Sequence, residues 1–216
     1  FYLEHSYKLI QKDTIKTSQL SIGNIVSYDD KYYQYVQTTA SEDVFGEYFN
    51  SNINDKSTLE NFYTQVNVQY ENKDLGNISG HLGYNNYNYG YNKLVILEGN
   101  TIINRIKDDV VSIGGSYKNT IGKFAVNGDF AINVLGDIDG NYLRGSTSFE
   151  FTDDIVARAY IHINSVKPNY NFLLHQSDYI NYNWQNDFEN VQTKQIGFNF
   201  LSNKYGELTA DFTTIN

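Results

Sequence analysis

The 216-residue chain contains no cysteine, and this absence excludes disulfides, zinc-thiolate sites and cysteine nucleophiles. A single proline suits long hydrogen-bonded ladders, because each proline removes a backbone donor. No stretch approaches the roughly eighteen consecutive apolar residues of a transmembrane helix, which excludes a helical membrane protein. Basic residues are few, 16 against 25 acidic ones, and the net charge of −9 argues against nucleic acid as a partner.

What the chain does contain is a series of segments, about ten residues long, in which apolar and polar residues alternate. The clearest are 62–71, 124–134 and 155–164, and weaker copies occupy 143–151, 195–200 and 208–212. Successive side chains of a strand point to opposite faces, so each segment forms a ribbon with one apolar and one polar face. This pattern is typical of an antiparallel, up-and-down transmembrane β-barrel in an outer membrane.

The alternation assigns individual residues to the two faces. We expect the apolar set to face outer-membrane lipid: Phe62, Val66, Val68, Phe124, Val126, Phe130, Ile132, Val134, Phe149, Ile161, Ile163, Phe198 and Phe200. We expect the polar set to line an aqueous lumen: Gln65, Asn67, Gln69, Glu71, His81, Asn127, Asp129, Asn133, Arg144, Glu150, Arg158, His162 and Asp211. Charges of both signs occur in the polar set. They either orient polar solutes, as charged rings do in pores, or pair across strands and fill a polar interior.

The pattern predicts about eleven strands, over residues 1–10, 19–28, 31–37, 61–72, 77–86, 110–118, 123–134, 141–151, 155–165, 193–201 and 207–214. Bacterial barrels avoid odd numbers, so at least one strand is missing or misread. The chain also lacks methionine, and residues 213–216 lack a closing aromatic residue. We therefore expect residues 1–216 to form a single segment of a larger barrel, whose signal peptide and further strands lie outside the printed sequence.

Short and long connections alternate between these segments. The short ones, at 29–30, 73–76, 119–122, 152–154 and 202–206, carry Asn, Asp or Gly. The long ones are 11–18, 38–60, 87–109, 135–140 and 166–192. Outer-membrane barrels have short periplasmic turns and longer outer loops, so the long connections are predicted to be extracellular. A soluble all-β protein is the alternative, although it has no physical reason to gather its long connections at one end.

Three features within the long connections carry predictions of their own. Leu94–Leu97 and Thr101–Ile106 flank Gly99-Asn100 and predict a small hairpin. Residues 41–55 have no clear period and predict a helical turn or an irregular loop. The run from Tyr84 to Asn92 alternates Tyr with Asn and Gly, and favours a strand anchored by tyrosine rings at the membrane interface. An aromatic platform for sugars and a prion-like segment are the other interpretations of this run.

Three parts of the sequence have a recognisable pattern: Asp178–Phe188 followed by Thr193–Phe198, the stretch Asn88–Asn92, and Gly114–Tyr117 followed by Ile121–Phe124. They resemble segments of the putative porin family of Bacteroidetes outer membranes. The likeness covers most of the chain, but these are strand and loop phrases without a chemical signature. The resemblance implies a barrel in the outer membrane, and it implies no particular solute.

No spacing points to an enzyme or a metal site. His5, His81, His162 and His175 stand on separate segments. Residues 137–141 resemble the start of a calcium loop, but Ser148 stands where the twelfth position needs Glu, which favours a polar turn. No Gly-x-Ser-x-Gly marks an activated serine, although a Ser-His-carboxylate set needs only to meet in space. We expect no catalytic residues, no metal and no cofactor.

The sequence therefore predicts an outer-membrane, porin-like channel for passive diffusion of small hydrophilic solutes, sieved by lumen width and charge. The alternative is a structural or interaction subunit of a larger outer-membrane assembly without transport activity. In that interpretation, residues 38–60 and 166–192 are docking surfaces for other outer-membrane proteins. Barrel diameter separates the two functions, because about eight strands leave a filled interior whereas about sixteen leave a channel.

Overall fold

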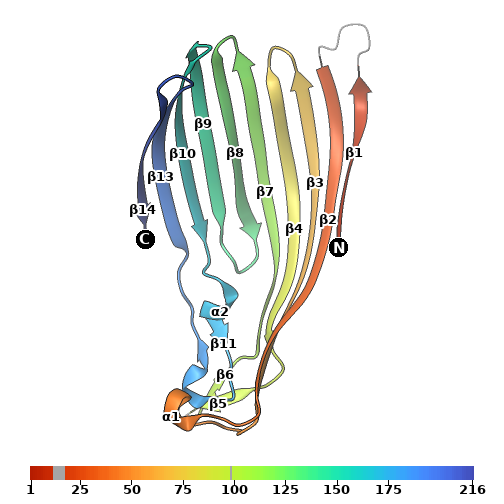
Figure 1. The fold of residues 1–216 in the computed structure, drawn as a ribbon. Helices are drawn as coiled ribbons and strands as arrows, with labels where there is room; N and C mark the ends of the chain where they lie inside the picture. The colour runs from red at the N-terminus through yellow and green to blue at the C-terminus, as the bar shows by residue number, and fades with distance from the viewer. Residues whose placement is uncertain (12–17, 98) are drawn as a thin grey trace.

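The computed structural model describes residues 1–11, 18–97 and 99–216 (Figure 1). Its main element is a ten-stranded antiparallel sheet in the order β1-β2-β3-β4-β7-β8-β9-β10-β13-β14. Since neighbours in the sheet follow one another along the chain, the predicted all-β, up-and-down meander is confirmed. The strands are β1 (Tyr2–Gln11), β2 (Ser18–Gln37), β3 (Ile53–Asn72), β4 (Gly76–Tyr91), β7 (Arg105–Ile121), β8 (Phe124–Leu135), β9 (Asn141–Thr152), β10 (Ile155–Val166), β13 (Val191–Ser202) and β14 (Gly206–Ile215).

The sheet contains ten strands rather than the predicted eleven, because the segments 19–28 and 31–37 form one strand, β2. Asp29 and Asp30 do not turn the chain but pair with Asn61 and Glu60 of β3. β2 and β3 form twenty consecutive residue pairs, and this ladder keeps Asp29 and Asp30 extended although aspartate favours turns. The odd number of predicted strands therefore arose from dividing one strand into two.

Because residues 29–30 form no turn, the connection between β1 and β2, predicted at 11–18 among the long connections, lies at the opposite end of the sheet from them. Gln11 of β1 pairs with Gln19 of β2, so these strands are joined at the end that carries the short turns 73–75, 122–123, 153–154 and 203–205. Residues 12–17 of this connection lie outside the described residues. The longer connections 38–52, 92–104, 136–140 and 167–190 all lie at the opposite end, the lower end in Figure 1. The predicted separation of short and long connections is confirmed for these eight.

Four neighbouring strands are much longer than the alternation predicted. β2 and β3 have 20 residues each, β4 has 16 and β7 has 17, whereas the remaining strands of the sheet have 10 to 12. A transmembrane β-strand needs about 9 to 11 residues. The predicted loops 38–60 and 87–109 are therefore too long, since part of each continues the ladder past the other strands (Figure 1). We call the part of these four strands beyond the last pair of β7 with β8 the extension; it comprises residues 27–37 of β2, 53–63 of β3, 85–91 of β4 and 105–110 of β7.

The long connections contain short strands and single helical turns. β5 (Val95–Leu97) and β6 (Asn100–Ile102) pair around Gly99, whose φ is 82°, so the predicted small hairpin is confirmed. Of the two alternatives for residues 41–55, the structure contains a helical turn, α1 (Glu42–Phe45), while residues 53–55 belong to β3. The connection 167–190 carries α2 (Tyr170–Leu173), β11 (Leu174–His175), the 3₁₀ turn η1 (Ile180–Tyr182) and β12 (Trp184–Gln185). Within the described ranges, no helix has the length and apolar character needed to cross a membrane.

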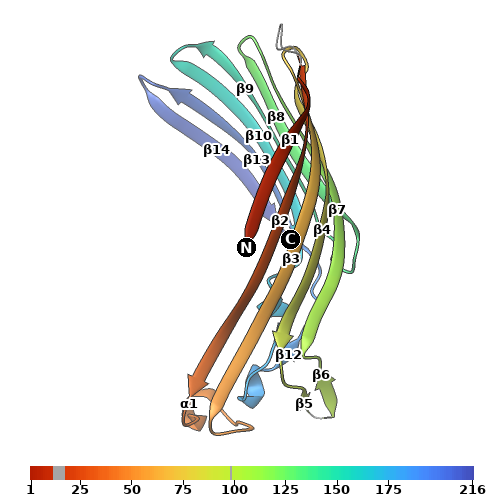
Figure 2. The ribbon, with the colours of Figure 1, turned by 90° about the vertical axis from the view of Figure 1, so that its right-hand side faces the viewer.

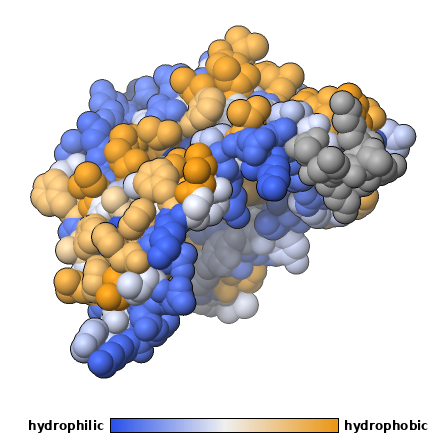
Figure 3. All heavy atoms as spheres, turned by 90° about the horizontal axis from the view of Figure 1, so that it is seen from above, coloured by the Kyte–Doolittle hydropathy of each residue, from blue (hydrophilic) through white to orange (hydrophobic). Residues whose placement is uncertain are grey.

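The sheet is a curved, open wall (Figure 2), with β1 at one edge and β14 at the other. Seen from above, it forms an arc (Figure 3). Hydrophobic side chains gather along the outer side of this arc and hydrophilic ones along its inner side. The curvature thus separates a convex apolar face from a concave polar face.

Candidate functional site

The strand register brings the predicted polar residues together on one face of the sheet. Residues that pair directly across strands lie on the same face. One such row crosses seven strands and runs from Asn67 on β3 to Thr193 on β13. Followed in this way, all thirteen residues predicted to line a lumen share the concave face. Of the thirteen predicted to meet lipid, twelve share the convex face, and Val134 lies at the register shift between β7 and β8, outside the direct pairs. We call the former face the polar face.

Charged residues on the polar face pair with polar neighbours on adjacent strands. Arg144 Nε lies 3.2 Å from the Asp129 carboxylate, and the two residues are direct partners in the ladder. The Arg158 guanidinium donates to the Ser146 hydroxyl at 3.3 Å. Gln195 donates to Asp211 at 3.1 Å. Charged residues therefore pair across strands, as the second of the two predicted interpretations requires. Among the described residues, Arg158 has no carboxylate partner.

A hollow of about 440 Å³ gathers part of the predicted set. It is lined by Asn127, Asp129, Arg144, Arg158 and His162, together with Ser146, Tyr160 and Gln195, which the sequence did not single out. Asn133 lies instead in a second hollow, near the long connections, with Asp137, Asp139, Lys167 and Glu189. Gln65, Asn67, Gln69, Glu71 and His81 stand on β3 and β4, and Glu150 and Asp211 lie outside the first hollow. The predicted residues thus share a face but form no single centre.

The polar face is crowded by large side chains that lean over glycines. The Asn67 side chain occupies the space beside Gly23, the His81 ring that beside Gly114, and the Tyr160 ring that beside Gly197. In each case the large residue is the direct cross-strand partner of the glycine. On the inside of a curved sheet the side chains converge, and a small partner makes room for a large one. The alternation of polar and apolar residues does not predict which large residue lies opposite a glycine, because that depends on the register between strands.

The extension carries a cluster of tyrosine rings that the sequence analysis predicted to be anchors at the membrane interface. Tyr87, Tyr89 and Tyr91 of β4 lie on the polar face and are only 2, 8 and 6% exposed. The ring of Tyr170, from α2, stacks on Tyr87 and on Tyr89 with centroid distances of 5.2 Å in both cases. These rings are covered by the connection 167–190, so their assignment as anchors at the membrane interface is wrong. Burial raises the pKa of the Tyr87, Tyr91 and Tyr170 phenols above the ordinary value.

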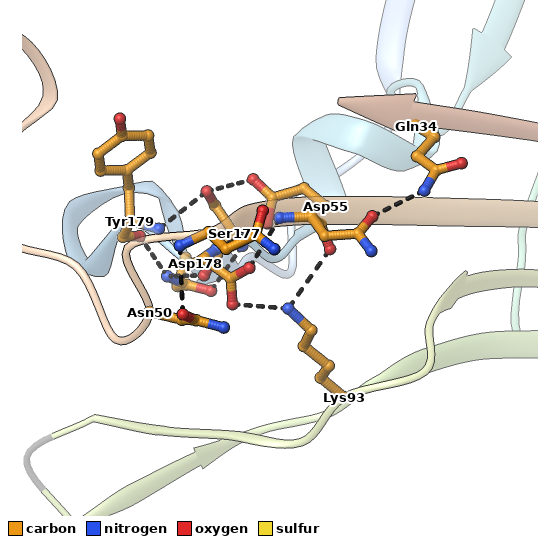
Figure 4. A network of polar contacts seen from close by, with 10 residues as sticks. Gln34, Asn50, Asp55, Lys93, Ser177, Asp178 and Tyr179 are labelled. Carbon is orange, nitrogen blue, oxygen red and sulfur yellow. Dashed lines mark hydrogen bonds and ion pairs between the residues drawn. The ribbon is translucent and has the colours of Figure 1, made fainter. Parts of the chain in front are cut away.

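A hydrogen-bond network fastens the connection 167–190 to the extension (Figure 4). The Asp178 carboxylate accepts from Lys93 Nζ at 2.6 Å and from the backbone N–H of Asn54 at 2.9 Å. The Asp55 carboxylate accepts from the Ser177 hydroxyl at 2.5 Å and from the backbone N–H of Asp178 at 2.7 Å. Carboxylates that accept several such bonds hold a loop firmly, because each bond has a charged acceptor.

The connections 38–52 and 167–190 also contact each other directly. Tyr48 and Tyr179 form an isolated β-bridge, and the backbone N–H of Phe49 donates to the Asp178 carbonyl at 2.8 Å. The Tyr179 hydroxyl accepts from the N–H of Ser41 and donates to Gln37, both at 2.9 Å. The two segments predicted as docking surfaces are therefore occupied in part by one another.

The candidate calcium loop and the four histidines are the remaining motifs of the sequence analysis. Residues 136–140 form the connection between β8 and β9, and the Asp108 carboxylate accepts from the N–H groups of Asp137 and Ile138. His5, His81, His162 and His175 stand on β1, β4, β10 and β11. In the part of the chain that the structure describes, no group of three or more His, Asp or Glu residues could hold a metal ion.

Comparison with protein-family models matches residues 1–216 to the family described as "Putative porin". Neither the curated proteins nor the solved structures contain a match to the chain.

Proposed function

The chain belongs to the putative porin family, and on that premise we propose that its polar face lines an aqueous passage for small hydrophilic solutes through the outer membrane. The observation that carries the proposal is the shared face of the thirteen polar residues across strands β3 to β14, opposite an apolar face. A wall with one apolar and one polar side suits a barrel between lipid and water. The long connections then face the outside.

In this proposal the ten strands form the wall of a larger barrel, as one segment. The edge strands β1 and β14 have backbone groups that need partners, because an open edge is unsuited to the hydrocarbon interior. Further strands would pair with both edges and enclose the polar face. Passage needs no cofactor and no energy source, since solutes move down their own gradients.

The charge of the polar face favours cations. The carboxylates that the register puts on this face outside the extension outnumber the basic residues; they are Glu4, Glu71, Asp129, Glu150, Glu207 and Asp211, against Lys8, Lys118, Arg144 and Arg158. Charged side chains along a pore select between cations and anions. We expect a channel formed by the full-length protein to be moderately selective for K⁺ over Cl⁻.

Single-channel recording of the full-length protein in a planar lipid bilayer tests the proposal. We expect an ohmic current, and we expect Arg158→Glu to raise the preference for K⁺, because it replaces a basic group that has no carboxylate partner among the described residues. Lys204→Glu makes the same change of charge in the turn 203–205 and should leave selectivity nearly unchanged. Silence under conditions where a known porin conducts would overturn the proposal in favour of a subunit without transport activity.

A further inference from the structure

A pocket of about 250 Å³ lies between the extension and the connection 167–190. Seven of its ten lining residues carry aromatic rings. Its members are Tyr33, Tyr35, Asp55, Ser57 and Tyr91 from the extension, Phe45 from α1, and His175, Ser177, Tyr179 and Tyr182 from the connection. Alternation along β2, β3 and β4 puts the residues of the extension on the polar face, at the end with the long connections.

The rings of this aromatic pocket are held by contacts with one another. The Phe45 ring lies 5.0 Å from that of Tyr179 and 6.1 Å from that of Tyr182, between centroids. On another wall, His175 contacts Tyr91 at 5.8 Å and stacks on Trp184 at 4.5 Å. Because these rings belong to three separate segments, the pocket forms only when the connection 167–190 is in place.

The pocket contains one carboxylate among its described lining residues, that of Asp55. Asp55 receives hydrogen bonds from Ser177 and from the backbone of Asp178, but no described Lys, Arg or His lies within ion-pair distance of it. The nearest ion pair of the network joins Lys93 to Asp178 instead. His175 Nδ1 lies 2.8 Å from the Tyr182 carbonyl, which can only accept, so Nδ1 carries a proton and Nε2 is an acceptor in the neutral ring.

We propose that the aromatic pocket binds an organic cation with a methylated ammonium head. The faces of aromatic rings attract cations, and cages of such rings recognise quaternary ammonium groups. The Asp55 carboxylate supplies the opposite charge that such a ligand needs. An anion would meet this carboxylate, and no lysine or arginine is among the described lining residues. A neutral sugar would gain from the rings but would have no ionic attraction to Asp55.

This inference goes beyond the passage of solutes and does not depend on it, since a pocket at the mouth of the wall can bind a ligand whether or not current flows. Binding and conductance are therefore measured separately. A silent protein that binds the cation would overturn only the proposed channel, whereas a conducting protein that does not bind it would overturn only the pocket.

Titration calorimetry of the full-length protein, in a detergent without ammonium groups, tests the proposal with choline. Its uncharged isostere 3,3-dimethylbutan-1-ol has the same shape without the positive charge. We expect choline to bind at least roughly tenfold more tightly than the alcohol, because only choline offers a cation to the rings and to Asp55. Equal binding of both compounds, or no binding of choline, would overturn the proposal.

A matched pair of substitutions on β2 locates the binding site. Tyr33 and Tyr32 are 69 and 68% exposed, but only Tyr33 lines the pocket, since the two neighbours point to opposite faces. Tyr33→Ala should weaken choline binding roughly two- to fivefold, the effect of one exposed cation–π contact, and Tyr32→Ala should not. An equal loss in both variants would contradict the assignment.

Asp55→Asn tests the charge itself, and the effect should be a loss of roughly tenfold or more in choline affinity with little change for the alcohol. Because Asp55 also fastens the connection 167–190, the fluorescence of Trp184 reports whether the fold of the pocket survives. Trp184 is the single tryptophan of the printed sequence and stacks on His175, and a Trp184→Phe variant identifies its signal. Retained affinity in a variant with an unchanged Trp184 signal would overturn the role of the carboxylate.

Discussion

Tyr160 on β10 lies directly opposite Gly197 on β13, and its ring fills the space that a side chain at position 197 would need. The pair places a large residue against the smallest one on the concave, polar face, where neighbouring side chains converge. The same relationship recurs between His81 and Gly114. Glycine weakens a strand elsewhere, so its presence here reflects the close approach of a ring.

Replacing Gly197 with alanine should therefore destabilise the protein by about 1–3 kcal/mol, because the added methyl group overlaps the Tyr160 ring and forces it to move. The shift is measurable as a lower urea midpoint, or as a lower temperature for loss of the compact band on gels. Gly128→Ala is the matched control, since its nearest neighbour on the convex face is the Arg144 carbonyl at 3.5 Å. Equal destabilisation by both substitutions would contradict the proposed overlap.

Asp178→Ala should loosen the connection 167–190 much more than Lys93→Ala. The Asp178 side chain is 8% exposed and accepts from the Asn54 N–H, so its removal leaves a donor unpaired at a cost of about 1–3 kcal/mol. The Lys93 side chain is 53% exposed, and Lys93→Ala leaves the Asp178 carboxylate with its hydrogen bond from the Asn54 N–H, so we expect the smaller effect from this substitution. Hydrogen exchange of residues 167–190 measures both effects. Asp187→Ala, at a fully exposed carboxylate, serves as the control and should change exchange little.

Alkaline pH should detach this connection. Burial raises the pKa of Tyr87, Tyr91 and Tyr170 in the folded protein, so each phenol keeps its proton to a higher pH when folded than when unfolded. Their contribution to stability is complete below the ordinary tyrosine pKa of about 10, and it falls as the pH rises above that value because the unfolded chain releases protons first. Tyrosinate absorbance and protease cleavage within 167–190 should rise together. Cleavage that precedes tyrosinate formation would contradict the linkage.

Two adjacent residues of β10 test the assignment of the two faces. Ile161 lies on the convex face and His162 on the polar face. A lysine on a lipid-facing position costs about 2–4 kcal/mol near the middle of the bilayer, whereas the lumen side tolerates charge. Ile161→Lys should therefore reduce folding into lipid vesicles, and His162→Lys should fold nearly as well as the unsubstituted protein. The reverse order would show that the faces are assigned the wrong way round.

The faces of the strands were predictable from the sequence because side-chain direction in a strand alternates with a period of two, and polarity is a local property. The same local reasoning found the hairpin around Gly99 and most of the short turns. It failed at Asp29-Asp30, where a pair of turn-forming residues sits within a ladder of twenty pairs to β3. Pairing with a distant segment outweighs local turn preference there, and no local pattern records it.

The sequence by itself determined the all-β meander and which residues share a face, since both follow from periodicity along single strands. Only the tertiary structure decided how far β2, β3, β4 and β7 extend, and that Tyr87, Tyr89 and Tyr91 are covered by the connection 167–190. Contacts such as that of Tyr89 with Leu174 join residues 85 positions apart, so they depend on how the sheet curves and where its strands end. The aromatic pocket around Asp55 has the same origin, because its walls come from segments that meet only in the folded chain.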